Sequence, residues 1–501
     1  MVRGLVFGST GLVLAVASAF WAWTNPAQLR QTVISTLVDR VPGIAATLEG
    51  ASMRLLGGIT LVGLRVARSD DLDKSDFAYV PRAVLYHDKE QLIDGKLAIR
   101  KVELQDPRLR LVRGRTGAWN LENLIPRMGD SNDPIPTLVV EGGVLQIEDR
   151  SSAGGVGVSP IGHLLEIRQV EMLAMNDPPG MFRLEAHGVS DLLGPVSLML
   201  EQERSSKMWA ARVELSELPV DADILRAAAA MLKVPELASL DVRGDGQVVV
   251  ELAGGGDRPI SHQASFHFRN LQARGSLVPL QLKDGSLEGR WVDGRVPILK
   301  MQGKLGDGEL KAQVDNLDLK PGAAGLTPDS VGGVWRASLT GMTISPELLK
   351  SMPMPCPSIG ELLNPAGLVD ISYSRAPMAS DPKQGIHRVE FRPRSATMRC
   401  KPFPYPLHGV NGMVGMDATR GQRPKLDVAL EGMAGPDPWT AKGNMEVEKG
   451  AWGINLHVDA PDVAIDQTLL DALPQQYRDL AMQFHPQGGR VKVDTRILAD
   501  V

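Results

Sequence analysis

Apolar and polar residues alternate along most of this chain with a period of two, which is the side-chain repeat of an extended strand. The alternating stretches are interrupted about every 8 to 12 residues by Gly, Asp or Pro, as in antiparallel strands joined by short turns. Such a chain is expected to be mainly β, with one apolar face on its sheet. The clearest apolar positions are Val196, Leu198, Leu200, Val248, Val250, Leu252, Leu426, Val428, Leu430, Ile454, Leu456 and Val458.

Helical patterns are too few to cover that apolar face. They are confined to residues 26–41, 121–125, 221–233, 345–350 and 466–480. About 25 strands spaced about 4.8 Å apart would extend roughly 120 Å. We therefore expect a long antiparallel sheet that curls and leaves an apolar groove, lined by the residues named above. A hydrocarbon chain suits such a groove, because each methylene removed from water contributes about 0.8 kcal/mol wherever it lies.

A short motif recurs three times: a strand leads into a polar residue, two spacers and a Leu-Leu-like pair. The polar residues are Asp221, Ser345 and Asp466, which lie 124 and 121 residues apart. Asp and Ser suit the N-cap of a short helix, because their side-chain oxygens accept hydrogen bonds from free helical amides. A second element, Pro-Leu followed by Gly, recurs 127 residues apart at Pro279 and Pro406. We therefore expect repeated β-groove modules of about 120–127 residues over 131–501, after a β region at 25–130.

The first 24 residues form a segment of a different kind. No charge lies between Arg3 and Arg30, and residues 5–23 are long enough to span the hydrocarbon core of a bilayer. This predicts a membrane anchor with tryptophans at its far interface and, from Arg3, a cytoplasmic N-terminus. A cleaved signal peptide is the alternative, and under either interpretation the following chain is exported. The anchoring residues would be Leu5, Leu12, Leu14, Trp21 and Trp23.

An amphipathic helix is predicted directly after this segment. Asn25 provides an N-cap and Pro26 the first helical position, and apolar residues then recur every four positions up to residue 41. The helix either lies on the outer surface of the membrane or covers the end of a sheet, and we favour the second interpretation.

The composition argues against several function classes. There are 54 Lys and Arg against 59 Asp and Glu, whereas nucleic-acid binders carry a basic excess. Two cysteines, Cys356 and Cys400, are too few for a disulfide-rich scaffold or a multi-cysteine metal site, and they either pair or stay free. The histidines are scattered, and the sequence has no P-loop and no G-x-S-x-G motif. We therefore expect no enzymatic activity, no catalytic residue, no metal and no cofactor.

The opening of the chain carries a recognisable pattern. GGITLVGLRVAR at 57–68 and LIDGKLAIRKVELQDPRLRLVRGRTGAWNLENLIP at 92–126 follow the apolar first segment. In the second stretch Gly117 permits a turn, Trp119 supplies a large side chain to bury, and Asn120 is placed to cap a helix over 121–125. This pattern resembles the AsmA-like family over residues 1 to about 130. The β-rich, repeat-bearing remainder is similar to AsmA, TamB and the chorein-type bridge proteins.

The resemblance implies a single-pass protein of the bacterial inner membrane, with most of its chain in the periplasm. It also implies that phospholipid acyl chains move through a long β-groove toward the outer membrane. The expected partners are therefore phospholipids and membrane, together with an outer-membrane or other envelope protein, but no nucleic acid. The alternative is a scaffold for outer-membrane proteins that pairs with its clients by strand addition. Because the sequence stops within an apparent strand, we expect either a longer protein or completion of the last strand by a partner.

Overall fold

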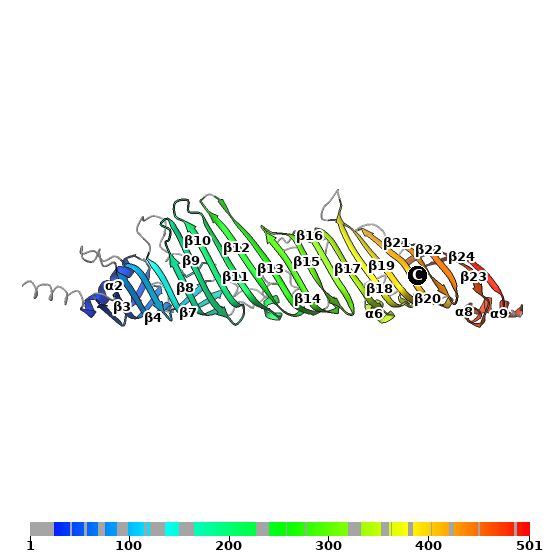
Figure 1. Ribbon diagram of the computed structural model, residues 1–501, viewed down its shortest axis with the longest axis horizontal. Helices are drawn as coiled ribbons and strands as arrows, with labels where there is room; N and C mark the ends of the chain where they lie inside the picture. Colours follow the sequence, from blue (N-terminus) through cyan, green and yellow to red (C-terminus); the bar gives the residue numbers. More distant parts are fainter. Residues whose placement is uncertain are drawn as a thin grey trace, which may run out of the picture. The chain divides into compact units, whose positions relative to one another are not determined.

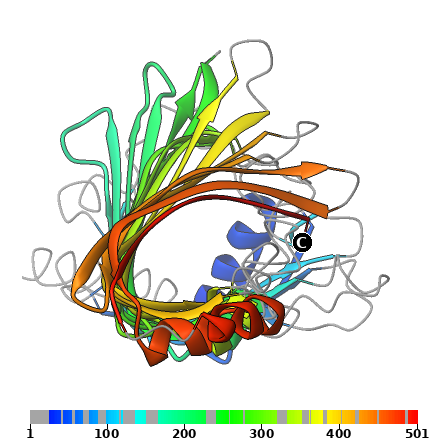
Figure 2. The same cartoon turned by 90° about the vertical axis from the view of Figure 1, so that its right-hand side faces the viewer.

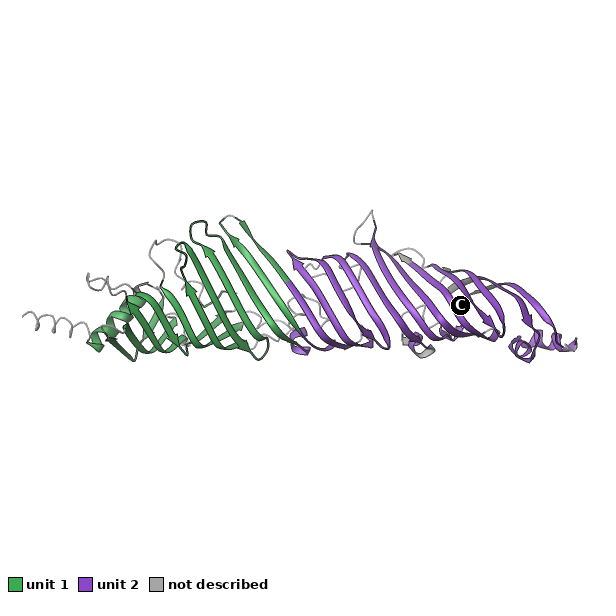
Figure 3. Ribbon diagram, in the orientation of Figure 1, with its two compact units in different colours: residues 1–219, 246–264 green, residues 220–245, 265–501 purple. Residues whose placement is uncertain are grey.

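The protein is mainly β, with antiparallel strands and a few short helices. The chain forms two compact units, coloured separately in Figure 3. Unit 1 comprises residues 1–219 and 246–264, and unit 2 comprises residues 220–245 and 265–501. The computed structural model describes residues 25–40, 43–54, 58–68, 76–87, 99–114, 118–120, 136–149, 165–226, 240–256, 258–275, 278–318, 332–351, 360–361, 363–378, 384–401, 403–419, 425–448, 451–484 and 488–500.

Unit 1 is a sheet preceded by helix α2 (Pro26–Arg40). β1 and β2 both pair with β3, and from β3 onward the strands cross the sheet in chain order except that β5 and β6 share one position (Figure 1); most neighbours are antiparallel. The strands are β1 (Ile44–Thr47), β2 (Gly50–Arg54), β3 (Gly58–Arg68), β4 (Asp76–His87), β5 (Ile99–Gln105), β6 (Arg108–Arg113), β7 (Thr137–Asp149), β8 (Leu165–Met175), β9 (Met181–Ser190), β10 (Gly194–Glu203) and β11 (Trp209–Val220). β12 (Asp241–Gly255) and β13 (Arg258–Gly275) contribute residues to both units.

Unit 1 departs from a simple antiparallel order at β7. Strands β5 and β6 are two segments of one interrupted strand, broken at Asp106 and Pro107, and both pair with β4 on one side. On the other side both pair with β7 in parallel. A parallel neighbour requires a crossover connection of a dozen or more residues, and residues 114–136 provide it. The expected long antiparallel sheet is thus present, with a parallel pairing at this position.

Unit 2 is an antiparallel sheet in which every strand from β14 to β24 pairs with the next. Its strands are β14 (Val278–Val292), β15 (Arg295–Leu305), β16 (Gly308–Asp318), β17 (Val334–Ile344), β18 (Ala366–Pro377), β19 (Gly385–Cys400), β20 (Phe403–Thr419), β21 (Lys425–Ala434), β22 (Asp437–Glu448), β23 (Ala451–Ala464) and β24 (Arg490–Asp500). Its helices are α6 (Pro346–Ser351), α8 (Gln467–Ala472) and α9 (Gln475–Gln483).

The strands of unit 2 are bent, and a row of irregular residues accounts for the bend. The pairing register shifts on four neighbouring strands, next to Gly341, Gly367, Ser395 and Gly409, each of which has a positive φ. Side-chain oxygens satisfy amides freed there: the amide of Gly341 donates to Asp370, 2.9 Å away. Bulges bend a strand and increase its twist, and Figure 2 shows the strands of unit 2 as arcs.

The three repeated polar residues are N-caps, as predicted. A side-chain oxygen of Asp221, Ser345 and Asp466 accepts a hydrogen bond from the amide three residues later, at 3.0, 3.2 and 2.8 Å. Six strands separate one cap from the next, β12–β17 and then β18–β23. An even number of antiparallel strands returns the chain to the same edge of a sheet, so α6 and α8 lie at one edge of unit 2. The 124- and 121-residue spacings thus correspond to six strands and one cap.

Short helices cover the sheet at particular places. The apolar side of α2 packs on the strands that follow it, with Leu29 and Val33 against Leu48 and Ile59. This arrangement agrees with the second interpretation of that helix, and Asn25 caps it through a 3.0 Å bond from the amide of Ala27. In unit 2, α8 packs on β20–β23 in the same way.

The helix expected over 466–480 is instead two helices, α8 and α9. Leu473, the residue before Pro474, has an extended ψ of 139°. A proline ring disfavours helical backbone at the residue before it and removes an amide donor. The break separates a buried α8 from an α9 without any buried residue.

Candidate functional site

An apolar ladder crosses β8 to β11 in unit 1. Leu198 lies opposite Ala186 on one side and Val213 on the other, and Met172 lies opposite Ala186. We call each row of cross-strand partners on this face a rung. Leu200 on β10 belongs to the rung on one side of Leu198, and Val196 belongs to the rung on the other side. The side chains of Met172, Ala186, Leu198 and Val213 are only partly buried. The ladder is therefore a continuous apolar surface, four strands wide, with no charged side chain in its rungs.

The predicted positions on β12 share this face. Glu251 forms a 2.7 Å ion pair with Arg212, and Gln247 donates to Glu214 at 2.8 Å, so both lie on the polar side of β11. Side chains alternate along a strand. Val248, Val250 and Leu252 consequently lie on the apolar side, and they too are partly buried.

The corresponding positions on β21 of unit 2 are much more deeply buried, whereas Leu456 and Val458 on β23 are partly buried. Leu426, Val428 and Leu430 on β21 belong to one core cluster, and Leu426 is only 2% exposed. Leu456 and Val458 on β23 pack against that cluster. Ile454 lies opposite Met445 in the register, but its side chain is outside the described part of the chain.

A small apolar cavity lies beside this core. It has a volume of about 80 Å³, and one side is formed by Leu349 of α6 and by Leu363. The lining contains no charged group. Its residues are Ile344, Leu349, Leu363, Pro365, Val369, Phe391, Pro393, Ala396, Thr397, Met398, Val410, Val414 and Leu430.

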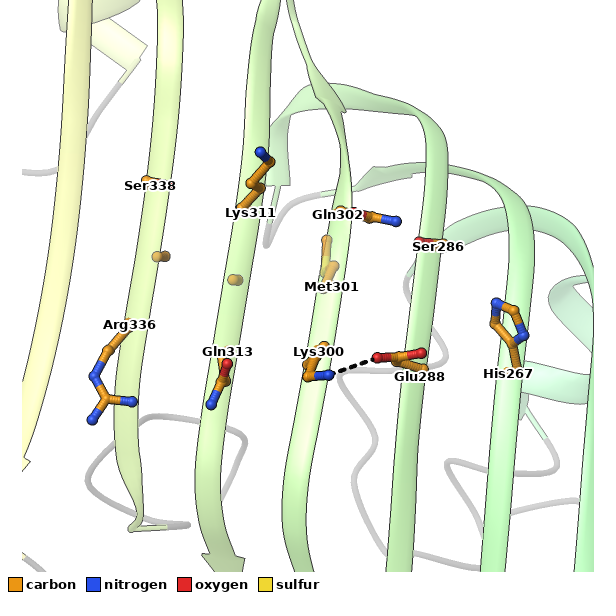
Figure 4. A pocket seen from close by; sticks show the side chains of 12 residues that line it. His267, Ser286, Glu288, Lys300, Met301, Gln302, Lys311, Gln313, Arg336 and Ser338 are labelled. Atoms are coloured by element: carbon orange, nitrogen blue, oxygen red, sulfur yellow. Dashed lines mark ion pairs between the residues drawn. The ribbon is translucent and has the colours of Figure 1, made fainter.

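The opposite face of the sheets is polar and carries cross-strand ion pairs. In unit 2 a hollow of about 530 Å³ is lined by side chains from β13 to β17, shown in Figure 4. Lys300 lies 3.1 Å from Glu288 across two strands of this hollow, and Arg336 forms a 2.7 Å pair with Asp315. Cross-strand pairs of this kind are typical of a solvated sheet face.

Two carboxylates on this polar face have a lowered pKa. In unit 1 the ammonium of Lys101 and the hydroxyl of Tyr86 lower the pKa of Glu103 by donating hydrogen bonds to it. In unit 2 the guanidinium groups of Arg388 and Arg392 lower the pKa of Glu390 in the same way. Both carboxylates remain ionised to lower pH than usual, as expected for salt bridges. Nearby in unit 1, Arg110 forms a 2.7 Å ion pair with Glu148.

The family-like motif near residue 120 has a different role from the expected one. Trp119 is 39% exposed, so the expectation that it would be buried was wrong; it forms an isolated bridge opposite Arg113 at the strand end instead. Asn120 accepts a bond from the amide of Val112 and donates to the carbonyl of Arg110, at 3.0 and 2.8 Å. These two hydrogen bonds hold the backbone at Asn120 against strand β6. Gly117 and the helix expected at 121–125 lie outside the described residues.

The predicted anchor also falls outside the described part of the chain, including Leu5, Leu12, Leu14, Trp21 and Trp23. Among the helices that are described, none combines the length and apolarity needed to cross a bilayer. Within the same residues, no three His, Cys, Asp or Glu side chains gather as a metal site would require. Cys400 is a free thiol whose pKa is raised by burial, and Cys356 is not described.

Comparisons with family models, curated proteins and solved structures find no match. The resemblance to the AsmA-like family therefore depends on the sequence pattern alone.

One residue that matters to the apolar face was missed from the sequence. Arg375 on β18 is completely buried and donates a 2.5 Å hydrogen bond to the carbonyl of Gly333. It has the same parity as Val369 and Ile371, whose side chains lie in the core cluster at this strand. A charged residue at an apolar position of the alternation was the signal that could have identified it.

Proposed function

We propose that this chain is an anchored envelope protein that holds phospholipid acyl chains against the apolar face of its sheets and conducts them between the inner and outer membranes. The observation that supports this most directly is the partly exposed ladder of Met172, Ala186, Leu198 and Val213. Apolar surface left exposed over several strands is unusual unless something binds to it. The absence of charge in the rungs suits a hydrocarbon better than a polar ligand.

The mechanism follows from the uniformity of this face. An acyl chain gains a similar free energy from each rung it covers, about 0.8 kcal/mol for each methylene. Movement from one rung to the next therefore exchanges equal contacts, and its barriers are small. The polar head group stays in water, and the protein performs no covalent chemistry. In unit 2 the 80 Å³ apolar cavity beside α6 provides room for only a few methylenes.

The scaffold alternative has less support. It requires a sheet edge, and among the described strands β24 pairs only with β23. Strand β24 carries Lys492, Asp494 and Arg496 at alternate positions, and charges along an edge strand commonly oppose such pairing.

Lipid extraction tests the proposed function. We expect phospholipid to co-purify with the full chain in mild detergent, as measured by mass spectrometry. Leu198→Asp and Val250→Asp place a charge on the apolar face and should reduce the bound lipid several-fold. Met199→Asp is the matched control, because Met199 neighbours Leu198 on the opposite, polar face and lies opposite Arg212. All variants retain the same N-terminal segment, so any lipid bound to that segment contributes equally to each measurement and does not affect the comparison. Equal lipid in Leu198→Asp and Met199→Asp would refute the proposal.

A further inference from the structure

Helix α9 presents an apolar stripe to solvent. Tyr477, Leu480 and Phe484 are 56, 53 and 79% exposed. Their spacing of three and four residues places them on one side of the helix, since such residues are neighbours on a helical surface. Phe484 continues the stripe because its backbone remains helical, with φ −86° and ψ 0°.

The rest of α9 fixes this orientation. Arg478, on another side of the helix, donates a 3.0 Å hydrogen bond to the carbonyl of Leu470 in α8. α8 is itself held in the core by Leu469 and Ala472. The stripe is thus turned away from the sheet by a helix pair anchored in unit 2, and Figure 2 shows both helices at the lower end of the strands.

We propose that this stripe docks on the surface of a phospholipid bilayer with uncharged head groups. Size argues against a protein partner held by the stripe alone. At about 200 Å² for each large side chain, the three exposed portions add to roughly 380 Å². A symmetric pair of such patches would bury about 750 Å², well under the roughly 1,200 Å² of a stable protein interface. A bilayer has no such minimum, and short amphipathic helices bind its interface reversibly.

Charge and residue type point the same way. The stripe is flanked on one side by the amides Gln476 and Gln483, and one acidic residue, Asp479, is exposed on the helix. Its one basic residue, Arg478, is bonded to α8. This rim offers no attraction to anionic lipid, and phosphatidylcholine or phosphatidylethanolamine fits it better. Tyr477 also suits the interface, where a tyrosine ring is buried while its hydroxyl stays in water. Such docking does not depend on lipid moving along the apolar face.

A fluorescent probe at the stripe tests the docking. Phe484→Cys and Met482→Cys, each with Cys356 and Cys400 replaced by Ser, are labelled with an environment-sensitive dye in the full chain. Met482 is the matched control: it is 50% exposed but lies on another side of α9. On addition of phosphatidylcholine vesicles we expect the fluorescence intensity of the dye at position 484 to rise at least two-fold and its emission to shift to the blue. The dye at position 482 should change little. The same change at 484 without vesicles as protein concentration rises would show self-association and overturn the proposal, as would no change at either position.

A second measurement separates this proposal from lipid transfer. The full chain reconstituted in one set of vesicles should tether a second, protein-free set, detected by light scattering. Leu480→Asp with Phe484→Asp should abolish tethering and leave the co-purified lipid unchanged, whereas Met482→Asp should alter neither. If Leu198→Asp lost bound lipid but still tethered vesicles, lipid binding on the apolar face and bilayer docking by α9 would be independent, as proposed. Unaltered tethering in the double variant would refute the docking of α9.

Discussion

The apolar faces of the two units differ in what covers them. On β8 to β11 of unit 1 the ladder side chains are partly exposed, and no described helix packs on them. On β21 of unit 2 the equivalent positions are buried in the core on which α8 packs, with Leu426 almost inaccessible. The same period-two pattern thus produces an open surface in one place and a closed core in another. The difference depends on a short capped helix, and the lipid-binding proposal applies to the uncovered stretch.

Charged substitutions at the two faces give the largest expected contrast. Leu426→Asp buries a carboxylate without a partner and should destabilise the protein by about 4 kcal/mol or more. Leu198→Asp leaves its carboxylate access to water and should cost about 1 to 2 kcal/mol. Denaturant unfolding of both variants measures the difference. Similar losses in the two variants would show that the ladder of unit 1 is as closed as the core of unit 2.

Removal of the helix caps tests the cover itself. Asp466→Ala leaves the amide of Leu469 without its acceptor and should cost about 1 kcal/mol, as N-cap deletions commonly do. Because α8 covers the core of β20 to β23, this variant should also increase the fluorescence of an apolar dye that binds exposed core. Asp466→Asn keeps an acceptor and is the control. If the Asn variant also bound more dye, the exposure of the core would not be caused by loss of the N-cap hydrogen bond.

The sequence predicted what local chemistry determines. Alternation indicated the strands and their apolar sides, and the caps at Asp221, Ser345 and Asp466 were identifiable because each bonds to an amide only three residues away. What it did not predict depends on contacts between distant segments. The parallel pairing of β7 and the exposure of Trp119 are examples, because no local pattern specifies either of them. The bulges at Gly341 and Ser395 were missed because positive φ is a property of the assembled sheet.

How deeply each apolar side chain is buried on this face could not be predicted from the sequence either. Leu198 and Leu426 occupy similar positions in alternating stretches, yet Leu426 belongs to a core cluster that includes residues of α8, whereas Leu198 is partly exposed. The N-terminal anchor, the lipid-lining role and the periplasmic location stay predictions, which the lipid and vesicle measurements address.

The smallest expected effects are on the polar faces, where the two units should behave alike. Glu103 and Glu390 each have a pKa lowered by basic partners, Lys101 in unit 1 and Arg388 in unit 2. A carboxylate with a lowered folded-state pKa stabilises the protein above its unfolded pKa of about 4.3, and the contribution is lost as pH falls through the folded value. Glu103→Gln and Glu390→Gln should each cost less than about 1 kcal/mol at pH 7, because the pairs are near the surface.

This cost should shrink as the pH falls below about 4.3 toward the lowered folded-state pKa, and unfolding of wild type and variants between pH 7 and pH 3 measures it. If the two variants lose equal, small and acid-sensitive amounts of unfolding free energy, the polar faces of the two units contribute alike to stability. The units would then differ in their apolar faces only. A cost several times larger for Glu390→Gln than for Glu103→Gln would indicate instead that ion pairs on β19 hold the bent strands of unit 2 in place. The closure of its core would then depend on the polar face as well as on α8.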